Sequence, residues 1–224
     1  MTEAPLDHMA AERSKILDAA LPHVPFEGWT ARTLRLAAED AGLDTSVAEL
    51  AFPSGSVDAI EYWSTVADVA MRVAYEQADT DAMRLREKIT FLVHARIEAV
   101  ADHREAVRRA ITHMSRPPYA RRGARALYRT VDDMWYAAGD RSTDFSFYTK
   151  RATLAGVLSS TVLFWLNDRS EGTAETWAFL DRRIANVMQI PKCRAAVRDL
   201  GNNLPDPRHF ARLVAERLRE GAVR

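Results

Sequence analysis

The spacing of apolar side chains follows the helical period of about 3.6 residues through nearly the whole chain. In one long segment, this spacing puts Ile60, Trp63, Ala67, Ala70 and Ala74 on one helical face. Almost no segment shows the two-residue alternation that a half-buried strand would need. The sequence therefore predicts an all-α protein.

Capping residues predict a small head at residues 1–55. Thr30 is placed to cap one short helix that ends before Gly42, and Asp44 or Thr45 is placed to cap the next. Two short helices joined by a tight turn have the spacing of a helix-turn-helix motif. We expect three helices in this head.

Longer helices predict a larger body at residues 56–190 and a tail at residues 191–224. Within the body, the stretch SRPPYARRG contains paired prolines, which predict a break and a new helix from about Arg121. In the tail, the stretch NNLPDP predicts a tether before one last helix at about Arg208–Arg219. A helix-turn-helix head joined to a larger helical body resembles the layout of TetR-type regulators, whose body binds a small apolar ligand.

The charge of the head argues against a nucleic-acid partner. Residues 1–60 contain four basic and ten acidic side chains, a net charge of −6, although the whole chain has a net charge of zero. The second helix of the motif, LDTSVAELAF, contains Asp44 and Glu49 and none of the Lys, Arg, Asn or Gln side chains that contact phosphates and bases. DNA would repel such a head. We expect a vestigial helix-turn-helix and no nucleic-acid partner, with a ligand-responsive transcription regulator as the alternative.

The tail has the opposite charge, with eight basic and four acidic side chains at residues 191–224. An apolar helical face flanked by arginines is typical of a helix that lies on an anionic membrane surface. The predicted membrane-binding residues are Arg208, Phe210, Arg212, Leu213, Val214 and Leu218. The alternative is an ordinary terminal helix that docks on its own body.

The sequence shows no convincing catalytic constellation. It contains no phosphate-binding loop, dinucleotide fingerprint, HExxH motif or Ser-centred elbow. His94, His103 and His113 cannot share one helix face at their spacings, and the single Cys193 excludes a multi-cysteine metal site. We expect no metal, no cofactor and no enzymatic activity.

One segment combines aromatic and acidic side chains in the manner of a protein-docking patch. Trp135, Tyr136, Phe145, Phe147 and Tyr148 fall within 14 residues, interleaved with several aspartates. Part of such a cluster belongs to the core, but its composition is also that of an interface.

The same segment resembles a known family. The stretch DDMWYAAGDRSTDFSFYTKRATLAGVLSSTVLFWLNDRSE, followed by TWAFLDRRI and preceded by PFEGWTARTLRLAAEDAGL and FPSGSVDAIEYW, is similar to the ubiquinone-biosynthesis family Coq-nine in its bacterial form. The resemblance covers about Arg13 to Lys192. It implies a TetR-like fold that has lost DNA binding, an accessory role without catalysis, and an isoprenoid quinone intermediate or phospholipid as ligand.

The resemblance also implies a partner, the di-iron demethoxyubiquinone hydroxylase, and a docking patch that contains Met134, Asp144, Phe147 and Tyr148. The aromatic residue before the Tyr is often Trp in the family and is Phe147 here, which removes an indole N–H from the contact. A homodimer and attachment to membranes through the C-terminal helix are further implications.

Two apolar segments of the body are candidates for the ligand cavity, and the alternatives for them are packed core or a dimer seam. The predicted lipid-binding residues are Leu92, Leu154, Val157, Leu158, Thr161, Trp165, Trp177, Leu180 and Ile184.

The location expected from the sequence is cytoplasmic and peripheral on the inner (plasma) membrane. The N-terminal residues show neither a secretory signal nor a transit peptide. The longest uncharged run, Ala152 to Asn167, has 16 residues, fewer than the ~20 that cross a bilayer.

Overall fold

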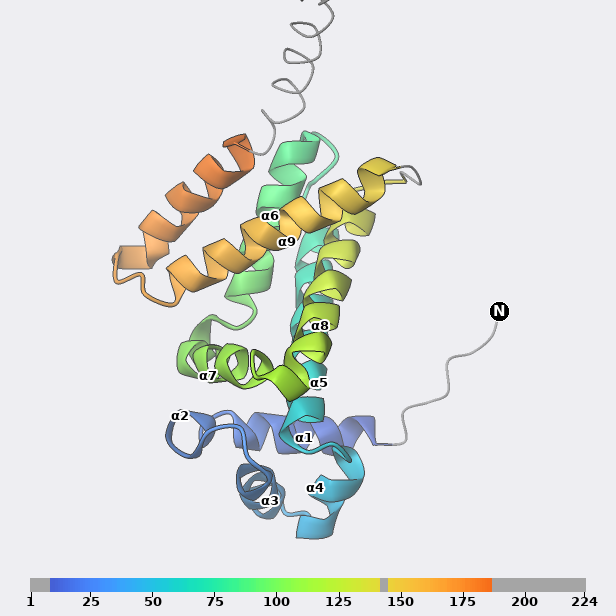
Figure 1. Cartoon of the computed structure of the whole chain (residues 1–224), viewed down its shortest axis with the longest axis vertical. Helices are drawn as coiled ribbons and strands as arrows, with labels where there is room; N and C mark the ends of the chain where they lie inside the picture. Colours follow the sequence, from blue (N-terminus) through green and yellow to red (C-terminus); the bar gives the residue numbers. More distant parts are fainter. Residues whose placement is uncertain (1–8, 142–144, 187–224) are drawn as a thin grey trace, which may run out of the picture. The chain divides into compact units, whose positions relative to one another are not determined.

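The computed structural model describes residues 9–141 and 145–186, and these residues contain helices and no strands (Figure 1). This confirms the all-α prediction. The chain divides into two compact units, Met1–Arg182 and Arg183–Arg224, and only residues 183–186 of the second are described. The division into a head, a body and a tail stays a prediction.

Four helices begin the first unit: α1 (Ala10–Ala20), α2 (Val24–Glu27), α3 (Ala31–Asp40) and α4 (Thr45–Ala51). The predicted caps of α3 and α4 are confirmed, because the Thr30 hydroxyl accepts a hydrogen bond from the Thr33 amide at 3.1 Å and the Asp44 carboxylate accepts one from the Ser46 amide at 2.9 Å. Gly42 links the two helices with a φ of +71°, a conformation that favours glycine. The one-turn helix α2 was not predicted.

The longer helices are α5 (Ser56–Gln77), α6 (Leu85–Glu98), α7 (Arg104–Met114), α8 (Pro117–Ala137) and α9 (Phe145–Trp165), and residues 174–186 are also helical. Helix α8 packs against α5, α7 and α9, and α5 packs against α6. These five helices surround the interior of the unit.

Helix α8 begins at Pro117, earlier than the predicted start near Arg121. Proline is tolerated in the first turn of a helix, where the missing amide would have no intrahelical partner and the fixed φ suits the helix. The two prolines that were expected to break the helix therefore start it.

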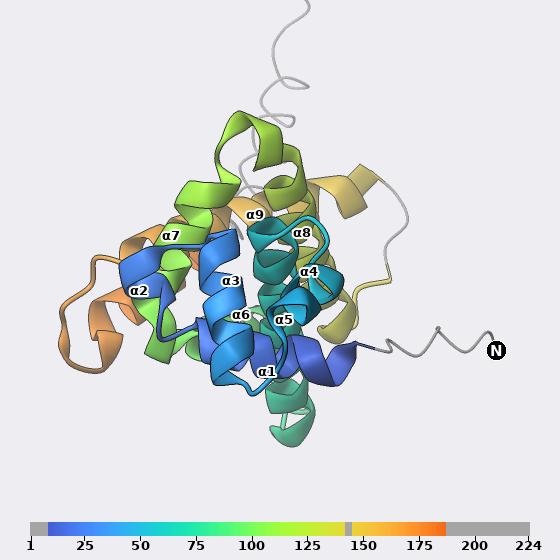
Figure 2. The ribbon, with the colours of Figure 1, turned by 90° about the horizontal axis from the view of Figure 1, so that it is seen from below.

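Trp29 joins the first four helices to the rest of the unit. It is buried, its indole Nε1 donates to the Ala106 carbonyl of α7 at 3.0 Å, and its ring lies 5.5 Å from that of Trp63 on α5. Figure 2 views the unit from the side of α1, α3 and α4, with α5 behind them. The described helices of the first unit thus share one apolar core.

Asp168 anchors the turn that leads into the last described helix. Its buried carboxylate accepts hydrogen bonds from the amides of Ser170 and Thr176, both at 2.8 Å, and from their hydroxyls. Burial raises the pKa of this carboxyl, but the hydrogen bonds outweigh burial and hold the pKa below its ordinary value.

Candidate binding cavity

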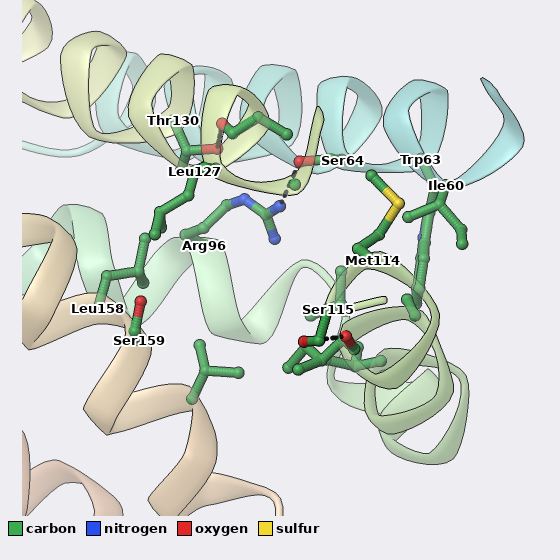
Figure 3. Close-up of a pocket in the computed structure, with 18 of the residues that line it drawn as sticks. Ile60, Trp63, Ser64, Arg96, Met114, Ser115, Leu127, Thr130, Leu158 and Ser159 are labelled. Carbon is green, nitrogen blue, oxygen red and sulfur yellow. Dashed lines mark hydrogen bonds between the residues drawn. The ribbon is translucent and has the colours of Figure 1, made fainter. Parts of the chain in front are cut away.

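An apolar cavity of about 590 Å³ lies between α5, α6, α7, α8 and α9 (Figure 3). Each of these helices contributes to its wall, for example Trp63 from α5, Ile97 from α6, Val107 from α7, Leu127 from α8 and Trp165 from α9. Ligand cavities in proteins usually have volumes of roughly 300–1,000 Å³ and predominantly apolar walls. This cavity fits that description.

Small side chains leave this space open. Ala110, Ala120, Gly123 and Ala124 line the cavity where larger apolar residues would fill it. At Gly123, an added Cβ would lie 3.2 Å from the Cβ of Met114, so glycine allows α7 and α8 to approach closely. The cavity is therefore a consequence of residue size on α7 and α8.

The cavity opens to solvent beside the turn between α7 and α8. Four of its lining residues are exposed: Ser115, Ala120 and Ala124 at the beginning of α8 and the preceding turn, and Leu163 on α9. Leu163 is 53% exposed. This opening has an apolar rim.

Arg96 is the one basic residue among the described residues that line the cavity. Its Nε donates to Asp68 Oδ1 at 2.7 Å, and its Nη2 donates to Ser64 Oγ at 3.2 Å. Asp68 is buried and also accepts a hydrogen bond from the Thr130 hydroxyl, which lies 2.8 Å from Oδ1 and 3.0 Å from Oδ2. Figure 3 shows the guanidinium of Arg96 reaching into the space between the helices.

Glu61 is the one acidic residue among the described lining residues, and it is paired with Arg122 of α8. Arg122 donates to Glu61 Oε1 at 2.8 Å and to Asp58 Oδ1 at 2.6 Å. The hydrogen bonds that Arg122 donates to these two carboxylates raise its pKa. Burial raises the pKa of Asp58, but the hydrogen bonds from Arg122 and Ser54 outweigh it and lower that pKa. Both ionisable lining residues therefore already have a partner of opposite charge.

Of the nine predicted lipid-binding residues, the structure places two in the cavity wall, Leu158 and Trp165. Five others are buried but do not line this cavity: Leu92, Leu154, Val157, Thr161 and Leu180. Trp177 lies against His94, with ring centroids 3.8 Å apart, and Ile184 is buried in the second unit. Most of the predicted set is therefore core around the cavity.

Sequence reasoning missed the contributions of α5, α7 and α8 to the cavity. A usable signal was present on α8, where Ala120, Gly123, Ala124 and Leu127 are spaced on one helical face and are mostly small. A stripe of small residues on a long helix leaves room beside it.

The predicted docking patch is only partly on the surface. Tyr148 is 66% exposed and packs edge-to-face against Phe147, with ring centroids 5.2 Å apart. The guanidinium of Arg151 lies 3.3 Å from the Phe147 ring centroid, and Arg151 also forms ion pairs with Asp132 and Asp140. These contacts hold the Phe147 ring in place and leave the Tyr148 side chain accessible to a partner protein.

Two other residues of that patch differ in their surroundings. Met134 is completely buried, so its thioether cannot touch a partner unless the helix moves. Asp144 lies outside the described residues, as do all six predicted membrane-binding residues of the tail.

Within the described residues, no group of His, Cys, Asp or Glu side chains could hold a metal ion, and no helix combines the length and hydropathy of a membrane span.

Comparison with known sequences identifies relatives over most of the chain. Residues 120–191 match the family model named COQ9, the Coq-nine family. The chain is 35% identical over 184 residues to the ubiquinone biosynthesis protein COQ9, mitochondrial, of Drosophila melanogaster, which covers 80% of this chain and 56% of the relative. It is 31% identical over 196 residues to the human protein of the same name, covering 85% of this chain and 62% of the relative. The chain thus spans about three fifths of the length of these relatives.

Comparison with solved structures identifies the fold. A TetR transcriptional regulator from Nitrosomonas europaea matches with a TM-score of 0.66 and 22% identity, over 80% of this chain and 98% of that one. The fatty acid degradation regulator FadR from Bacillus halodurans matches with a TM-score of 0.54 and 15% identity, over 82% and 97%. These likenesses confirm a TetR-like architecture. The chain is therefore similar in sequence to the COQ9 family, and it has a TetR-like all-α fold.

Proposed function

We propose that this protein is a non-enzymatic, lipid-binding accessory protein of ubiquinone biosynthesis. It binds an isoprenoid quinone intermediate in the cavity between α5 and α9 and presents it to the demethoxyubiquinone hydroxylase. The single observation that carries the proposal is the apolar cavity of about 590 Å³ in a chain whose relatives are named ubiquinone biosynthesis proteins.

The cavity offers what a polyprenyl ligand needs. Exposing such a ligand to water costs about 0.8 kcal/mol for each CH₂ group, so a carrier must cover the tail. The walls provided by Trp63, Leu127 and Trp165 are apolar, and the exposed rim at Leu163 gives the tail a way out toward solvent or a membrane. A long tail can therefore extend beyond the cavity.

The described lining residues support binding without catalysis. General acid–base chemistry requires an ionisable side chain that is free to exchange a proton with the ligand. The two charged lining residues, Arg96 and Glu61, are instead held in ion pairs with Asp68 and Arg122.

The surface of α4 supports a protein that has lost DNA binding. It argues against the alternative function, a TetR-type transcription regulator. The helix exposes Glu49 and Leu50, and Leu50 is 66% exposed. Arg35 lies 3.9 Å from the Glu49 carboxylate, which reduces the charge it could offer to a phosphate. Sequence-specific binding in a DNA shift assay at low salt would favour the regulator.

The proposal includes two surfaces and a location. Tyr148 and Phe147 contact the hydroxylase, and the basic tail holds the protein on the cytoplasmic face of the inner (plasma) membrane, where an anionic surface attracts it. The protein acts as a homodimer. The exposure of Tyr148 is the observation that supports the first surface.

Filling the cavity tests the proposal. Ala124 is exposed and lines the cavity, whereas Ala70 is an exposed residue of α5 that does not line it. Ala124→Phe should raise the Kd for a short-chain ubiquinone at least tenfold, because the ring occupies space that the ligand needs, and Ala70→Phe should leave it within twofold. Quenching of the tryptophan fluorescence by the quinone measures both, since Trp63 and Trp165 lie in the wall. Equal affinity of the two folded variants would place the ligand elsewhere and refute the proposal.

A further inference from the structure

Arg96 has hydrogen-bonding capacity that the protein does not use. Its side chain is 15% exposed, and its Nε and Nη2 bond to Asp68 and Ser64. Its Nη1 makes no hydrogen bond to any residue that the structure describes. Nη1 is not one of the fully buried side-chain atoms that lack a partner, so it is accessible from the cavity and can donate to a ligand group that enters there.

The charge of this donor is already neutralised. Asp68 is 1% exposed and lies 2.7 Å from the Arg96 Nε, and the Thr130 hydroxyl also donates to it. Arg129 lies 3.8 Å from Asp68 but is half-exposed and therefore screened by solvent. The cavity thus presents N–H donors with little net positive charge.

This combination selects the chemistry of the ligand's head group. A carboxylate or phosphate would lose its hydration on entering and would meet both Arg96 and the nearby carboxylate of Asp68. An uncharged oxygen acceptor loses much less hydration free energy on entering and can still accept a hydrogen bond from the guanidinium.

We propose that Arg96 is the specificity-determining residue of the cavity. It donates a hydrogen bond through Nη1 to an uncharged ring oxygen of the ligand, a carbonyl, hydroxyl or methoxy group. The isoprenoid tail then lies along the apolar walls formed by residues such as Trp63, Met114 and Leu127. The inference rests on the proposed function, since it assigns an orientation to the ligand of the same cavity.

A matched pair of ligands tests this inference on the full chain. Geranyl-1,4-benzoquinone and geranylbenzene have the same tail, but only the first has ring oxygens. Displacement of the neutral fluorophore N-phenyl-1-naphthylamine gives an affinity for each. A hydrogen bond to a charged donor predicts that the benzoquinone binds roughly 10- to 100-fold more tightly to the wild-type protein. Equal affinities would overturn the inference and leave the lipid cavity standing.

A matched pair of variants assigns the preference to Arg96. Arg96→Lys keeps a positive charge for Asp68 but removes the second and third nitrogens, so the preference should fall below threefold. Arg129→Lys alters another arginine beside Asp68 that does not line the cavity, and the preference should persist. An unchanged preference in Arg96→Lys would overturn the assignment. Should that variant fail to fold, equal affinities of the two ligands for the wild-type protein would still overturn the inference.

Two further outcomes separate the possible failures. Tighter binding of geranyl phosphate than of the benzoquinone would show that the site selects anions, which would overturn the inference alone. Failure of every one of these compounds to displace the fluorophore would refute the proposed function and the inference together.

Discussion

Replacement of Thr130 by valine should destabilise the protein through one lost hydrogen bond. Thr130 is 3% exposed, and its hydroxyl lies within 3.0 Å of both oxygens of the buried Asp68 carboxylate. Because a hydroxyl carries one proton, these two short distances amount to one hydrogen bond. Valine has nearly the same shape but cannot donate, so Asp68 keeps its contact with Arg96 and loses this one.

The expected cost follows from the charge of the acceptor. A hydrogen bond to a charged group contributes about 1.5–3 kcal/mol, against about 0.5–1.5 kcal/mol for a neutral pair. For a chain of this size, the loss should lower the Tm by roughly 3–12 °C. Urea denaturation with an unchanged slope gives the free energy directly.

Thr112→Val is the matched control for this prediction. Thr112 is exposed on α7 and donates only to the Arg108 carbonyl of its own helix, so its replacement should change the free energy of unfolding by less than about 0.5 kcal/mol. If Thr130→Val costs no more than Thr112→Val, the buried network contributes little and the reasoning is refuted.

Three further predictions concern the acid stability, the docking patch and the tail. The pKa of Asp168 is lower in the folded state, so its stabilising contribution is complete above the unfolded pKa of about 3.9 and is lost as the pH falls toward the folded pKa. Asp168→Asn should therefore lower the Tm at pH 7 and flatten the decline of the Tm between pH 5 and 3. An unchanged dependence of the Tm on pH would contradict this. Met134→Ala should lower the free energy of unfolding by about 2–5 kcal/mol because it leaves a cavity at a buried site. Tyr148→Ala should leave the Tm unchanged and weaken binding to the hydroxylase by about 1–3 kcal/mol. Calorimetry measures the first effect and surface plasmon resonance the second, and an unaffected affinity in Tyr148→Ala would exclude Tyr148 from the interface. Deletion of Asp206–Arg224 should abolish sedimentation with anionic liposomes while the helical circular dichroism of the remainder persists, and retained sedimentation would mean that the tail docks on its own body.

Local signals in the sequence were sufficient to predict the all-α class and two helix caps. The caps at Thr30 and Asp44 act through side chains two or three residues away, so they can be recognised without knowledge of the rest of the molecule. The start of α8 at Pro117 was missed because the same proline can end one helix or begin the next. Packing against α7 and α9 decides between these outcomes, and it is not a local property.

The cavity could not be predicted in the same way. Helix α9 has apolar residues on several faces, and the sequence does not show which face meets another helix and which meets a void. Leu154 and Leu158 are one turn apart, yet only Leu158 lines the cavity. The difference arises because small residues on α7 and α8, including Ala110 and Gly123, lie opposite one part of α9 and leave space there. That pairing of elements distant in sequence exists only in the folded chain.

Native mass spectrometry with organic extraction shows whether the cavity carries a quinone. Full-length protein purified from a quinone-producing host should carry an isoprenoid quinone or a quinone precursor at a substantial fraction of one per chain. The Ala124→Phe variant purified in parallel should carry much less, because the added ring occupies part of the cavity. Wild-type protein that contains no quinone, although the same lysate yields abundant quinone on extraction, would contradict the claim that this cavity carries the lipid.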